Sequence, residues 1–291
     1  AEKPFKLDIC AMPEHESFIF WYAKEQGWDK DEGLDFQIHF FQTGMDQLEA
    51  LPAKQWVVGG TGTVPILVGA LRYNTYLIGI ANDESWVNAV TVRPDNPALK
   101  VKGWNPEYPN LLGSPETVKG KTFLTTTVSS AHYGLSSWLK VLGLTDKDIT
   151  IKNMDQASAL AAFEYGIGDI VTLWAPLTYV GEKRGWKVAS TPHDCYRGLP
   201  IVIVADREFA DKNPEQVRAF LRVYLRVVDA MHSEGFDAFV QEYIRFNKTW
   251  NEKLMTREEA VEDLRAHPVF SLGEQITLFH PESGNLRNWL R

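Results

Sequence analysis

The order in which strand-like and helix-like segments follow one another constrains this chain most. Residues 5–10 and 34–40 alternate apolar and polar side chains with the period of two that is typical of half-buried strands. Residues 17–26 carry apolar side chains at helical spacing, and Gly27 ends this segment. Further strands are predicted at 56–59, 77–81 and 87–92. Such alternation predicts a mostly parallel sheet covered by helices.

This pattern stops at residues 93–117, which are rich in proline and poor in periodic apolar positions. It then restarts, with a helix predicted after Ser129 and ended by Gly143. The strands expected in this part lie at 122–124, 149–151, 170–173 and 199–204. The last third is helical, with a cap and proline at Asn213-Pro214 and a capping box from Ser271 to Glu274.

Because the alternating pattern of strands and helices occurs twice, the sequence predicts two α/β domains within the 291 residues. We expect lobe 1 to consist of residues 1–92 and 200–291, because the chain returns to it with the C-terminal helices. We expect lobe 2 to consist of residues 93–199. Two crossover strands would then form a hinge.

Composition excludes several classes of protein. The 30 Lys and Arg against 38 Asp and Glu give a net charge of −8 without a basic tract, which argues against nucleic-acid binding. The chain has no run of 18 apolar residues that would predict a transmembrane helix. Ala1-Glu2-Lys3-Pro4 is typical of what remains after cleavage behind small residues, so we expect a processed, exported protein. Cys10 and Cys195 are either one long-range disulfide or two buried thiols.

Ligands of open parallel sheets bind beyond the carboxyl ends of the strands. Two such segments, Gly60-Thr61-Gly62-Thr63 and residues 125–130, are small and rich in hydroxyls. Each is predicted to join a strand to a helix, where free N–H groups and hydroxyls can bind an anion. The alternative is ordinary helix capping. All the segments expected at strand ends are 11–17, 41–44, 60–64, 82–86, 125–132 and 172–176.

Motifs for cofactors and metals are missing from the sequence. Gly60-Thr61-Gly62 is not a dinucleotide fingerprint, and no phosphate-binding GxxxxGK[ST] occurs. The seven histidines form no close ligand pair, so we expect no metal and no cofactor. His132 either donates to an anion or is a half-exposed helical histidine.

Aromatic and acidic residues are also frequent at the predicted strand ends. The aromatic residues can line a cleft or belong to the core; they are Trp21, Trp86, Trp174 and Tyr196. The carboxylates can act as acids or bases, bind an amine, or be solvated; they are Glu14, Glu16, Asp83 and Glu84.

Four stretches together resemble the periplasmic substrate-binding proteins of ABC importers for nitrate, sulfonate and taurine. The first is Gly33-Leu34-Asp35, followed by Gly44 and by Leu48-Glu49-Ala50-Leu51. The second is the loop after the third strand, residues 58–65. The third joins Val118-Lys119-Gly120-Lys121-Thr122 to residues 127–132, and the fourth joins Gly168-Asp169-Ile170 to Trp174-Ala175-Pro176.

The resemblance implies a type II periplasmic-binding-protein fold, with two α/β lobes joined by a two-strand hinge and a small anionic ligand held between them. It implies a periplasmic, monomeric, non-enzymatic protein that delivers its ligand to a membrane permease. The residues expected to bind the ligand lie at strand ends; they are Glu14, His15, Gly44, Thr61, Gly62, Thr63, Asp83, Thr127, Ser129, Ser130, His132 and Trp174.

Departures from the family pattern leave the ligand open. Thr61 and Thr63 stand where relatives often have other polar or acidic residues, Ala175 stands where a carboxylate is common, and the loop at 12–16 is unusually charged. The aromatic residues favour an anion with an apolar or planar body. The rival reading is a desulfinase-like enzyme with Cys10 as nucleophile, which requires a reactive thiol. Another branch of the family makes the pyrimidine of thiamine, but the cysteine-rich motif expected of that branch is absent from this sequence. A soluble sensor or receptor lobe is a further alternative.

Overall fold

Two five-stranded sheets organise this computed structural model, which describes residues 2–70 and 73–281. The chain divides into unit 1, Ala1–Asp83 with Pro200–Arg291, and unit 2, Glu84–Leu199. Each unit contains one of the sheets, and each is described by itself.

The sheet of unit 1 has the strand order β2-β1-β3-β10-β4. Its strands are β1 (Phe5–Ala11), β2 (Leu34–Phe40), β3 (Val58–Gly62), β4 (Thr75–Asp83) and β10 (Pro200–Asp206). β1 is parallel to β2 and β3, whereas β10 is antiparallel to both β3 and β4. Four strands therefore run in one direction, as the alternating pattern predicts, and β10 runs in the other.

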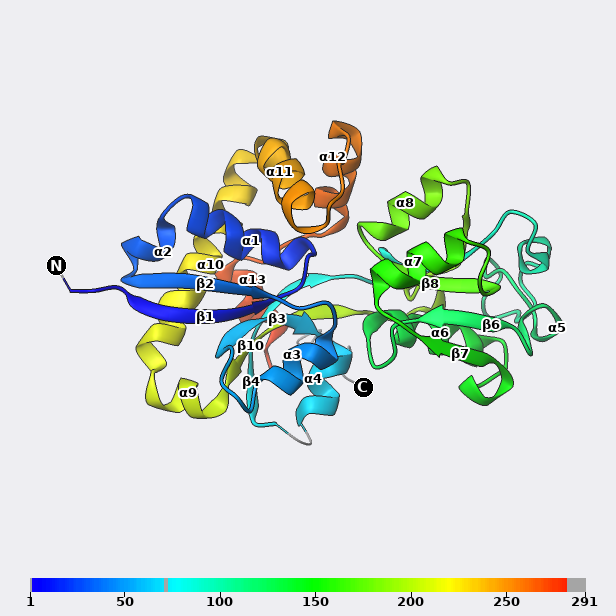
Figure 1. Ribbon diagram of the computed structural model, residues 1–291, viewed down its shortest axis with the longest axis horizontal. Coiled ribbons are helices and arrows are strands. Elements are labelled where there is room, and N and C mark those ends of the chain that lie inside the picture. The colour runs from blue at the N-terminus through cyan, green and yellow to red at the C-terminus, as the bar shows by residue number, and fades with distance from the viewer. Residues whose placement is uncertain (1, 71–72, 282–291) are drawn as a thin grey trace. The chain divides into compact units, whose positions relative to one another are not determined.

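Helices cover both faces of this sheet (Figure 1). They are α1 (His15–Glu25), α2 (Trp28–Asp31), α3 (Gly44–Ala50), α4 (Thr63–Ala70), α9 (Arg207–Lys212) and α10 (Pro214–Glu234). On one face, Phe220 of α10 packs against Phe20 and Phe36, with ring centroids 5.5 and 5.8 Å apart. On the other face, α3 and α4 cover a core that contains Cys10 and Val202. Successive strand residues point to opposite faces, so both faces carry apolar side chains.

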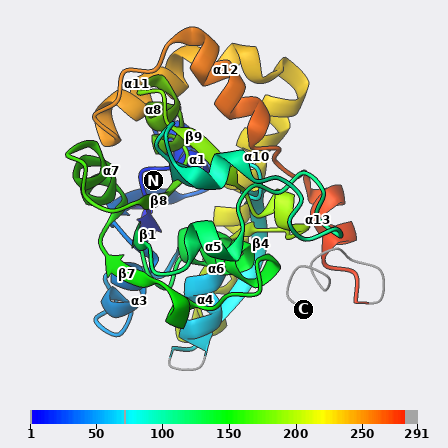
Figure 2. The same ribbon diagram turned by 90° about the vertical axis from the view of Figure 1, so that its right-hand side faces the viewer.

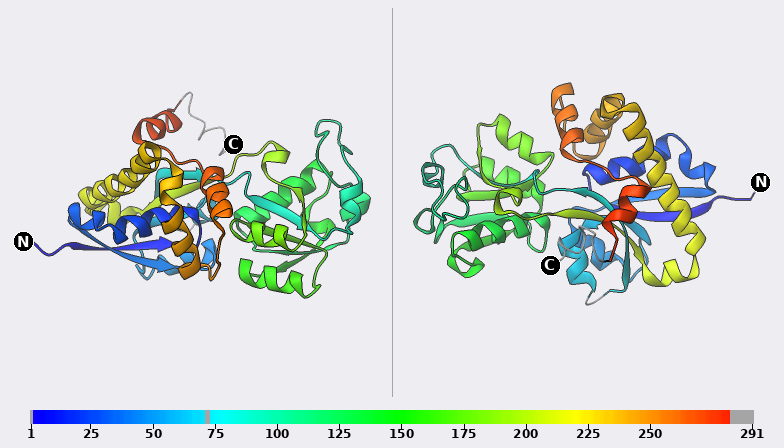
Figure 3. Two further views of the ribbon diagram at one scale, coloured as in Figure 1. Left: turned by 90° about the horizontal axis from the view of Figure 1, so that it is seen from above. Right: turned by 180° about the vertical axis from the view of Figure 1, so that it is seen from behind.

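The C-terminal helices of unit 1 are α11 (Val240–Trp250), α12 (Arg257–Ala266) and α13 (Leu272–Leu278). α11 and α12 lie next to each other (Figure 2), and Tyr243 of α11 packs edge-on against Phe18 of α1 at 5.0 Å. The predicted capping box at Ser271 is present. Asn213 precedes α10 (yellow in Figure 3) as predicted, but its side chain does not cap that helix; it donates to Phe209 O at 3.1 Å.

The sheet of unit 2 has the strand order β7-β6-β8-β5-β9. Its strands are β5 (Asn88–Val92), β6 (Thr122–Thr125), β7 (Thr150–Asn153), β8 (Ile170–Trp174) and β9 (Lys187–Ser190). β6 is parallel to β7 and β8, and β5 is antiparallel to β8 and β9. The helices are α5 (Pro115–Val118), α6 (Ser130–Val141), α7 (Gln156–Glu164) and α8 (Leu177–Lys183). Phe123 of β6 and Trp138 of α6 belong to the main core of this unit.

The first domain boundary differs from the expected one. The strand at 87–92 was expected in lobe 1, but β5 pairs with β8 and β9 and so belongs to the sheet of unit 2. The division falls between Asp83 and Glu84, and again between Leu199 and Pro200. Sequence pattern places the break at the proline-rich segment, whereas strand pairing decides which sheet a strand joins.

Within the described ranges, none of the helices has both the length and the apolar character that crossing a membrane requires.

Candidate functional site

Unit 1 brings its strand ends together at one edge of the sheet. β1, β2, β3 and β4 run in one direction, so the segments after Ala11, Phe40, Gly62 and Asp83 meet there. The register shows this: Ala11 lies beside Phe40, and the neighbouring residues Pro200 and Ile201 pair with Asp83 and Gly62. The candidate residues of unit 1 therefore belong to one region.

The glycine-rich segment after residue 58 is a strand and not the expected loop, since Gly60, Thr61 and Gly62 all lie in β3. The glycines are needed for packing. A Cβ on Gly59 would lie 2.2 Å from the carbonyl oxygen of Cys10, and one on Gly60 would lie 2.8 Å from Cγ of Glu16. Close approach of β1 and α1 therefore accounts for this part of the motif, without a ligand.

The two threonines of this segment differ in their hydrogen bonds. The hydroxyl of Thr63 donates to the carbonyl of Pro200, which ties the start of α4 to β10. The hydroxyl of Thr61 is buried and has no hydrogen-bond partner among the described residues. A buried hydroxyl without a partner costs about 1–3 kcal/mol. Thr61 is therefore the stronger candidate for a ligand contact, and Thr63 is a structural residue.

Gly44 has a packing role that the sequence did not indicate. It is the first residue of α3, and a Cβ there would lie 2.4 Å from Cγ of Pro65 and 3.5 Å from Oγ1 of Thr61. Thr43 caps α3 by accepting from the N–H of Asp46 at 3.1 Å. The absence of a side chain at 44 thus lets α3 meet α4 beside the Thr61 hydroxyl.

His15 is buried in the core of unit 1. Its ring stacks on that of His267, with centroids 4.5 Å apart and planes 6° from parallel, and it meets Tyr243 edge-on at 5.9 Å. Burial lowers the pKa of His15 well below its ordinary value, His267 lowers it further, and a hydrogen bond with Asn82 opposes this in part. His15 is therefore a neutral, packed side chain, which argues against the expected contact with a ligand.

Three of the four carboxylates at the strand ends are buried rather than solvated, contrary to one of the alternatives. Glu14 and Glu16 in unit 1 are 5% and 0% exposed, and Glu84 in unit 2 is 1% exposed. Asp83 is partly exposed at the end of β4. Within either unit alone, the described residues bring together no three His, Cys, Asp or Glu side chains close enough to share a metal ion.

The cysteines do not support the enzyme alternative. Both are free thiols, so they do not form the disulfide that the sequence left open. Cys10 is fully buried, and burial and the nearby Glu16 carboxylate raise its pKa well above the ordinary value. Burial raises the pKa of Cys195 to about 11. A nucleophilic cysteine needs an accessible thiolate. The Cys10 thiol is not exposed, and its raised pKa disfavours the thiolate.

In unit 2 the parallel strands β6, β7 and β8 end at Thr125, Asn153 and Trp174. Gln156, the first residue of α7, links the segments that follow β6 and β8. Its Nε2 donates to Thr126 Oγ1 at 3.1 Å and to the carbonyl of Thr172 at 3.1 Å, and its Oε1 accepts from the N–H of Trp174 at 2.9 Å. Sequence reasoning missed Gln156, which directly follows Asp155, the N-cap of α7.

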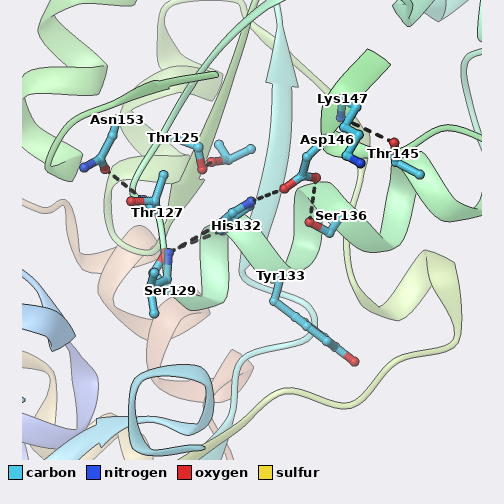
Figure 4. Close-up of polar contacts among 12 residues, drawn as sticks. Thr125, Thr127, Ser129, His132, Tyr133, Ser136, Thr145, Asp146, Lys147 and Asn153 are labelled. Carbon is cyan, nitrogen blue, oxygen red and sulfur yellow. Dashed lines mark hydrogen bonds and ion pairs between the residues drawn. The ribbon is translucent and has the colours of Figure 1, made fainter. Parts of the chain in front are cut away.

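The loop between β6 and α6 is held by several hydrogen bonds (Figure 4). The N–H of Thr127 donates to Asn153 Oδ1 at 2.9 Å, and the N–H of Val128 donates to His132 Nδ1 at 3.3 Å. Val128 has φ of +54°. The left-handed conformation costs a β-branched residue roughly 1–2 kcal/mol, and a hydrogen bond contributes about 0.5–1.5 kcal/mol. Hydrogen bonds of this loop can therefore hold its conformation.

Ser129 and Ser130 have different roles. Ser129 is the N-cap of α6: its hydroxyl accepts from the N–H groups of Ala131 and His132 at 3.2 and 3.4 Å and donates to the carbonyl of Thr126. The capping alternative therefore describes Ser129. Ser130 begins the helix, and its hydroxyl takes part in none of the hydrogen bonds found among the described residues.

His132 was expected to donate a hydrogen bond to an anion, but its ring nitrogens are already engaged. Its Nδ1 accepts from Val128, and its Nε2 lies 2.8 Å from a carboxylate oxygen of Asp146. Both ring nitrogens are thus engaged within unit 2. The side-chain hydroxyls of Thr127 and Ser130 remain, together with the N-terminus of α6, whose first turn carries no acidic residue. That terminus bears partial positive charge.

Only some of the aromatic candidates are exposed. Trp21 is 7% exposed and packs in the core against Phe246, so it does not line a cleft. Trp174 is also 7% exposed. Trp86 is 61% exposed and stacks on His193 with centroids 3.4 Å apart. Tyr196, 69% exposed, likewise stacks on another ring of unit 2.

A cavity of about 590 Å³ in unit 1 lies away from these strand ends. Asp206, one of its lining residues, ends the antiparallel β10 and pairs with Thr75 at the start of β4. The cavity therefore opens at the opposite edge of the sheet. Its Lys54 contacts Asp206 at 2.7 Å, so opposite charges already pair there.

The sequence relatives of this chain include two proteins named as periplasmic. A protein of Brachyspira hyodysenteriae, named as an ABC transporter periplasmic binding protein, is 26% identical over 272 residues, which are 92% of this chain and 77% of that protein. The taurine-binding periplasmic protein of Escherichia coli (strain K12) is 26% identical over 200 residues, 66% of this chain and 56% of that protein.

A solved structure shows the fold. The alkanesulfonate-binding protein SsuA of Xanthomonas axonopodis pv. citri, bound to MOPS, has a TM-score of 0.72 at 18% identity, over 92% of this chain and 86% of that one. The type II periplasmic-binding-protein fold implied by the sequence is thereby confirmed. Residues 108–235 also match the family described as NMT1/THI5 like. This chain is therefore similar to proteins named as periplasmic binding proteins, and its residues 108–235 are similar to the family described as NMT1/THI5 like.

Proposed function

We propose that this chain is the extracytoplasmic binding protein of an ABC importer and captures a small organic anion of the sulfonate class. Two relatives are named as periplasmic binding proteins, one of them for taurine. One structural neighbour is an alkanesulfonate-binding protein bound to MOPS, itself a sulfonate. The relatives are binding proteins rather than enzymes, and the buried Cys10 argues in the same direction.

The donors at the start of α6 carry this proposal. A sulfonate stays ionised at any physiological pH, so it needs hydrogen-bond donors and no base. Thr127 and Ser130 offer hydroxyls. The N-terminus of the twelve-residue α6 adds partial positive charge, although Ser129 already accepts from the N–H groups of Ala131 and His132. The strand-end segments expected from the sequence contain no Lys or Arg, so these neutral donors and the helix terminus would bind the anion.

Thr61 is the proposed contribution of unit 1. Its buried hydroxyl lacks a partner among the described residues, and a ligand oxygen would supply one. A ligand that contacts groups of both units shifts the protein toward the conformation in which it can do so. This is the behaviour that delivery to a permease requires. We further propose that the protein is a monomer in the periplasm.

Isothermal titration calorimetry and thermal unfolding test the proposal. The panel is taurine, ethanesulfonate, MOPS, nitrate and benzoate. A bound ligand at 100 times its Kd adds about 2.7 kcal/mol of stability, which raises the melting temperature by several degrees. We expect a sulfonate to bind and to be recovered unchanged. Comparison of taurine with ethanesulfonate measures whether the carboxylates near the β1 and β4 ends favour an amine. Binding of nitrate or benzoate without any sulfonate would contradict the substrate class.

A further inference from the structure

The loop between β6 and α6 presents the groups that we assign to the anion. Its backbone is fixed at consecutive residues, because the N–H of Thr127 donates to Asn153 and the N–H of Val128 donates to His132. Asn153 belongs to the neighbouring strand β7, whereas His132 belongs to the first turn of α6. The second hydrogen bond therefore closes the loop onto the helix that follows it.

Val128 makes this closure necessary. Its φ of +54° lies in the left-handed region, which a β-branched side chain disfavours. Thr127 and Ser129 adjoin Val128 directly, so relaxation of its backbone would move the Thr127 hydroxyl and the cap of α6. A hydrogen bond from the N–H of Val128 opposes that relaxation.

Asp146 sets the form of His132 that can accept this bond. Asp146 Oδ2 lies 2.8 Å from His132 Nε2, and its Oδ1 accepts from the hydroxyl of Ser136 at 3.2 Å (Figure 4). A carboxylate only accepts hydrogen bonds, so the imidazole proton resides on Nε2 and leaves Nδ1 as the acceptor for Val128.

We propose that His132 is a positioning residue, oriented by Asp146, that holds the β6–α6 loop in the conformation that binds the anion. His132 then acts on affinity without touching the ligand. The binding test of this inference rests on the proposed function, which assigns the β6–α6 loop to the ligand.

Calorimetric titration with taurine tests the binding consequence. We expect His132→Ala to weaken taurine binding about tenfold, the effect of losing one well-placed hydrogen bond, and Asp146→Ala to weaken it less. His39→Gln is the matched control, because His39 forms an equivalent pair with Asp8 of unit 1 at 2.8 Å but no hydrogen bond with a strand-end loop. Thermal unfolding checks that each variant is folded.

A second variant separates positioning from ligand contact. Glycine adopts the left-handed conformation without penalty, so Val128→Gly reduces the need for the hydrogen bond from His132. We therefore expect His132→Ala to lose less affinity in the Val128→Gly background than in the native chain. Equal losses in both backgrounds, or unchanged affinity of His132→Ala, would overturn the positioning role.

Nuclear magnetic resonance tests the hydrogen bond without any ligand. Long-range ¹H–¹⁵N spectra should show the proton of His132 on Nε2, and the Val128 amide should exchange slowly in the native chain and faster in His132→Ala. A proton on Nδ1, or a freely exchanging Val128 amide, would overturn the inference. If the native chain binds none of the three sulfonates of the panel, the sulfonate assignment loses its support, and these spectra still decide whether His132 holds the loop.

Discussion

The rings of His15 and His267 stack face to face with their centroids 4.5 Å apart, although 252 positions separate them in the chain. The stack joins the first turn of α1 to the residue that follows α12. A proton on His15 is unfavourable, because the ring is buried and its charge would not be solvated.

This stack predicts that the protein loses stability in mild acid. The pKa of His15 lies well below 6.5 in the folded state because of burial and His267. As pH falls below about 6.5 the unfolded chain binds a proton that the folded chain does not, so stability falls by up to about 1.4 kcal/mol per pH unit until the folded pKa is reached.

Urea unfolding between pH 8 and pH 5 measures this loss. His15→Phe keeps a planar ring and removes the titrating group, so we expect a flatter pH profile. His39→Gln removes an exposed histidine outside the stack and serves as the control for the loss of a histidine. An unchanged slope in His15→Phe would show that His15 does not cause the acid sensitivity.

The two serines before α6 should separate stability from binding. Ser129→Ala removes the cap of α6 and should cost about 1 kcal/mol of unfolding free energy. Ser130→Ala removes a hydroxyl that makes no hydrogen bond among the described residues, so we expect stability near that of the native chain and weaker sulfonate binding. Denaturant unfolding and calorimetric titration measure the two effects. Native affinity in Ser130→Ala would remove this hydroxyl from the proposed site.

Glycine at position 59 should be indispensable for the fold. A Cβ there would lie 2.2 Å from the carbonyl oxygen of Cys10, which belongs to the rigid strand β1. We expect Gly59→Ala to lower the unfolding free energy by about 3 kcal/mol or more. Gly273→Ala is the control: nothing lies within 4 Å of its Cβ, and alanine favours the helix by about 0.5–1 kcal/mol. A Gly59→Ala variant of native stability would contradict the packing argument.

Thiol titration tests the burial of the two cysteines. Neither thiol should react with an aromatic disulfide reagent in the native protein, because both are buried and their pKa values are raised. In guanidinium chloride we expect two free thiols per chain. Rapid reaction of Cys10 in the native state would reopen the enzyme reading, which Cys10→Ser would then test.

Local patterns predicted the secondary structure well because they act over a few residues. Ser129 and Ser271 cap the helices expected to follow them, and the period-two segments at 5–10 and 34–40 are strands. The meeting of strand ends also follows from sequence, since alternation with helices predicts parallel strands. The strand at 87–92 was predicted in lobe 1, whereas β5 pairs with β8 in the sheet of unit 2. Local patterns do not reveal this, because strand pairing is decided by residues distant in the chain.

The sequence predicted which regions of the chain form the candidate site, but not the role of each residue in it. Residue type does not reveal whether a hydroxyl is already used: Thr63 donates to Pro200, 137 residues away, whereas Thr61 has no partner among the described residues. Likewise, the His132 side chain is engaged by Val128 and Asp146, and no local pattern indicates a left-handed valine. Such roles depend on tertiary contacts.

Thr61→Val should separate the proposed ligand contact from folding. The Thr61 hydroxyl is buried without a partner among the described residues, so replacing it with a methyl group removes a desolvation cost. We expect the ligand-free protein to keep or gain stability, by about 1 kcal/mol, while sulfonate affinity falls. Thr63→Val, two residues further along the chain, is the matched control: it loses the hydrogen bond to Pro200 and should be destabilised by about 1 kcal/mol. Thr61→Ser keeps the hydroxyl and should retain binding. If Thr61→Val binds the sulfonate as tightly as the native chain, unit 1 contacts the ligand through other groups.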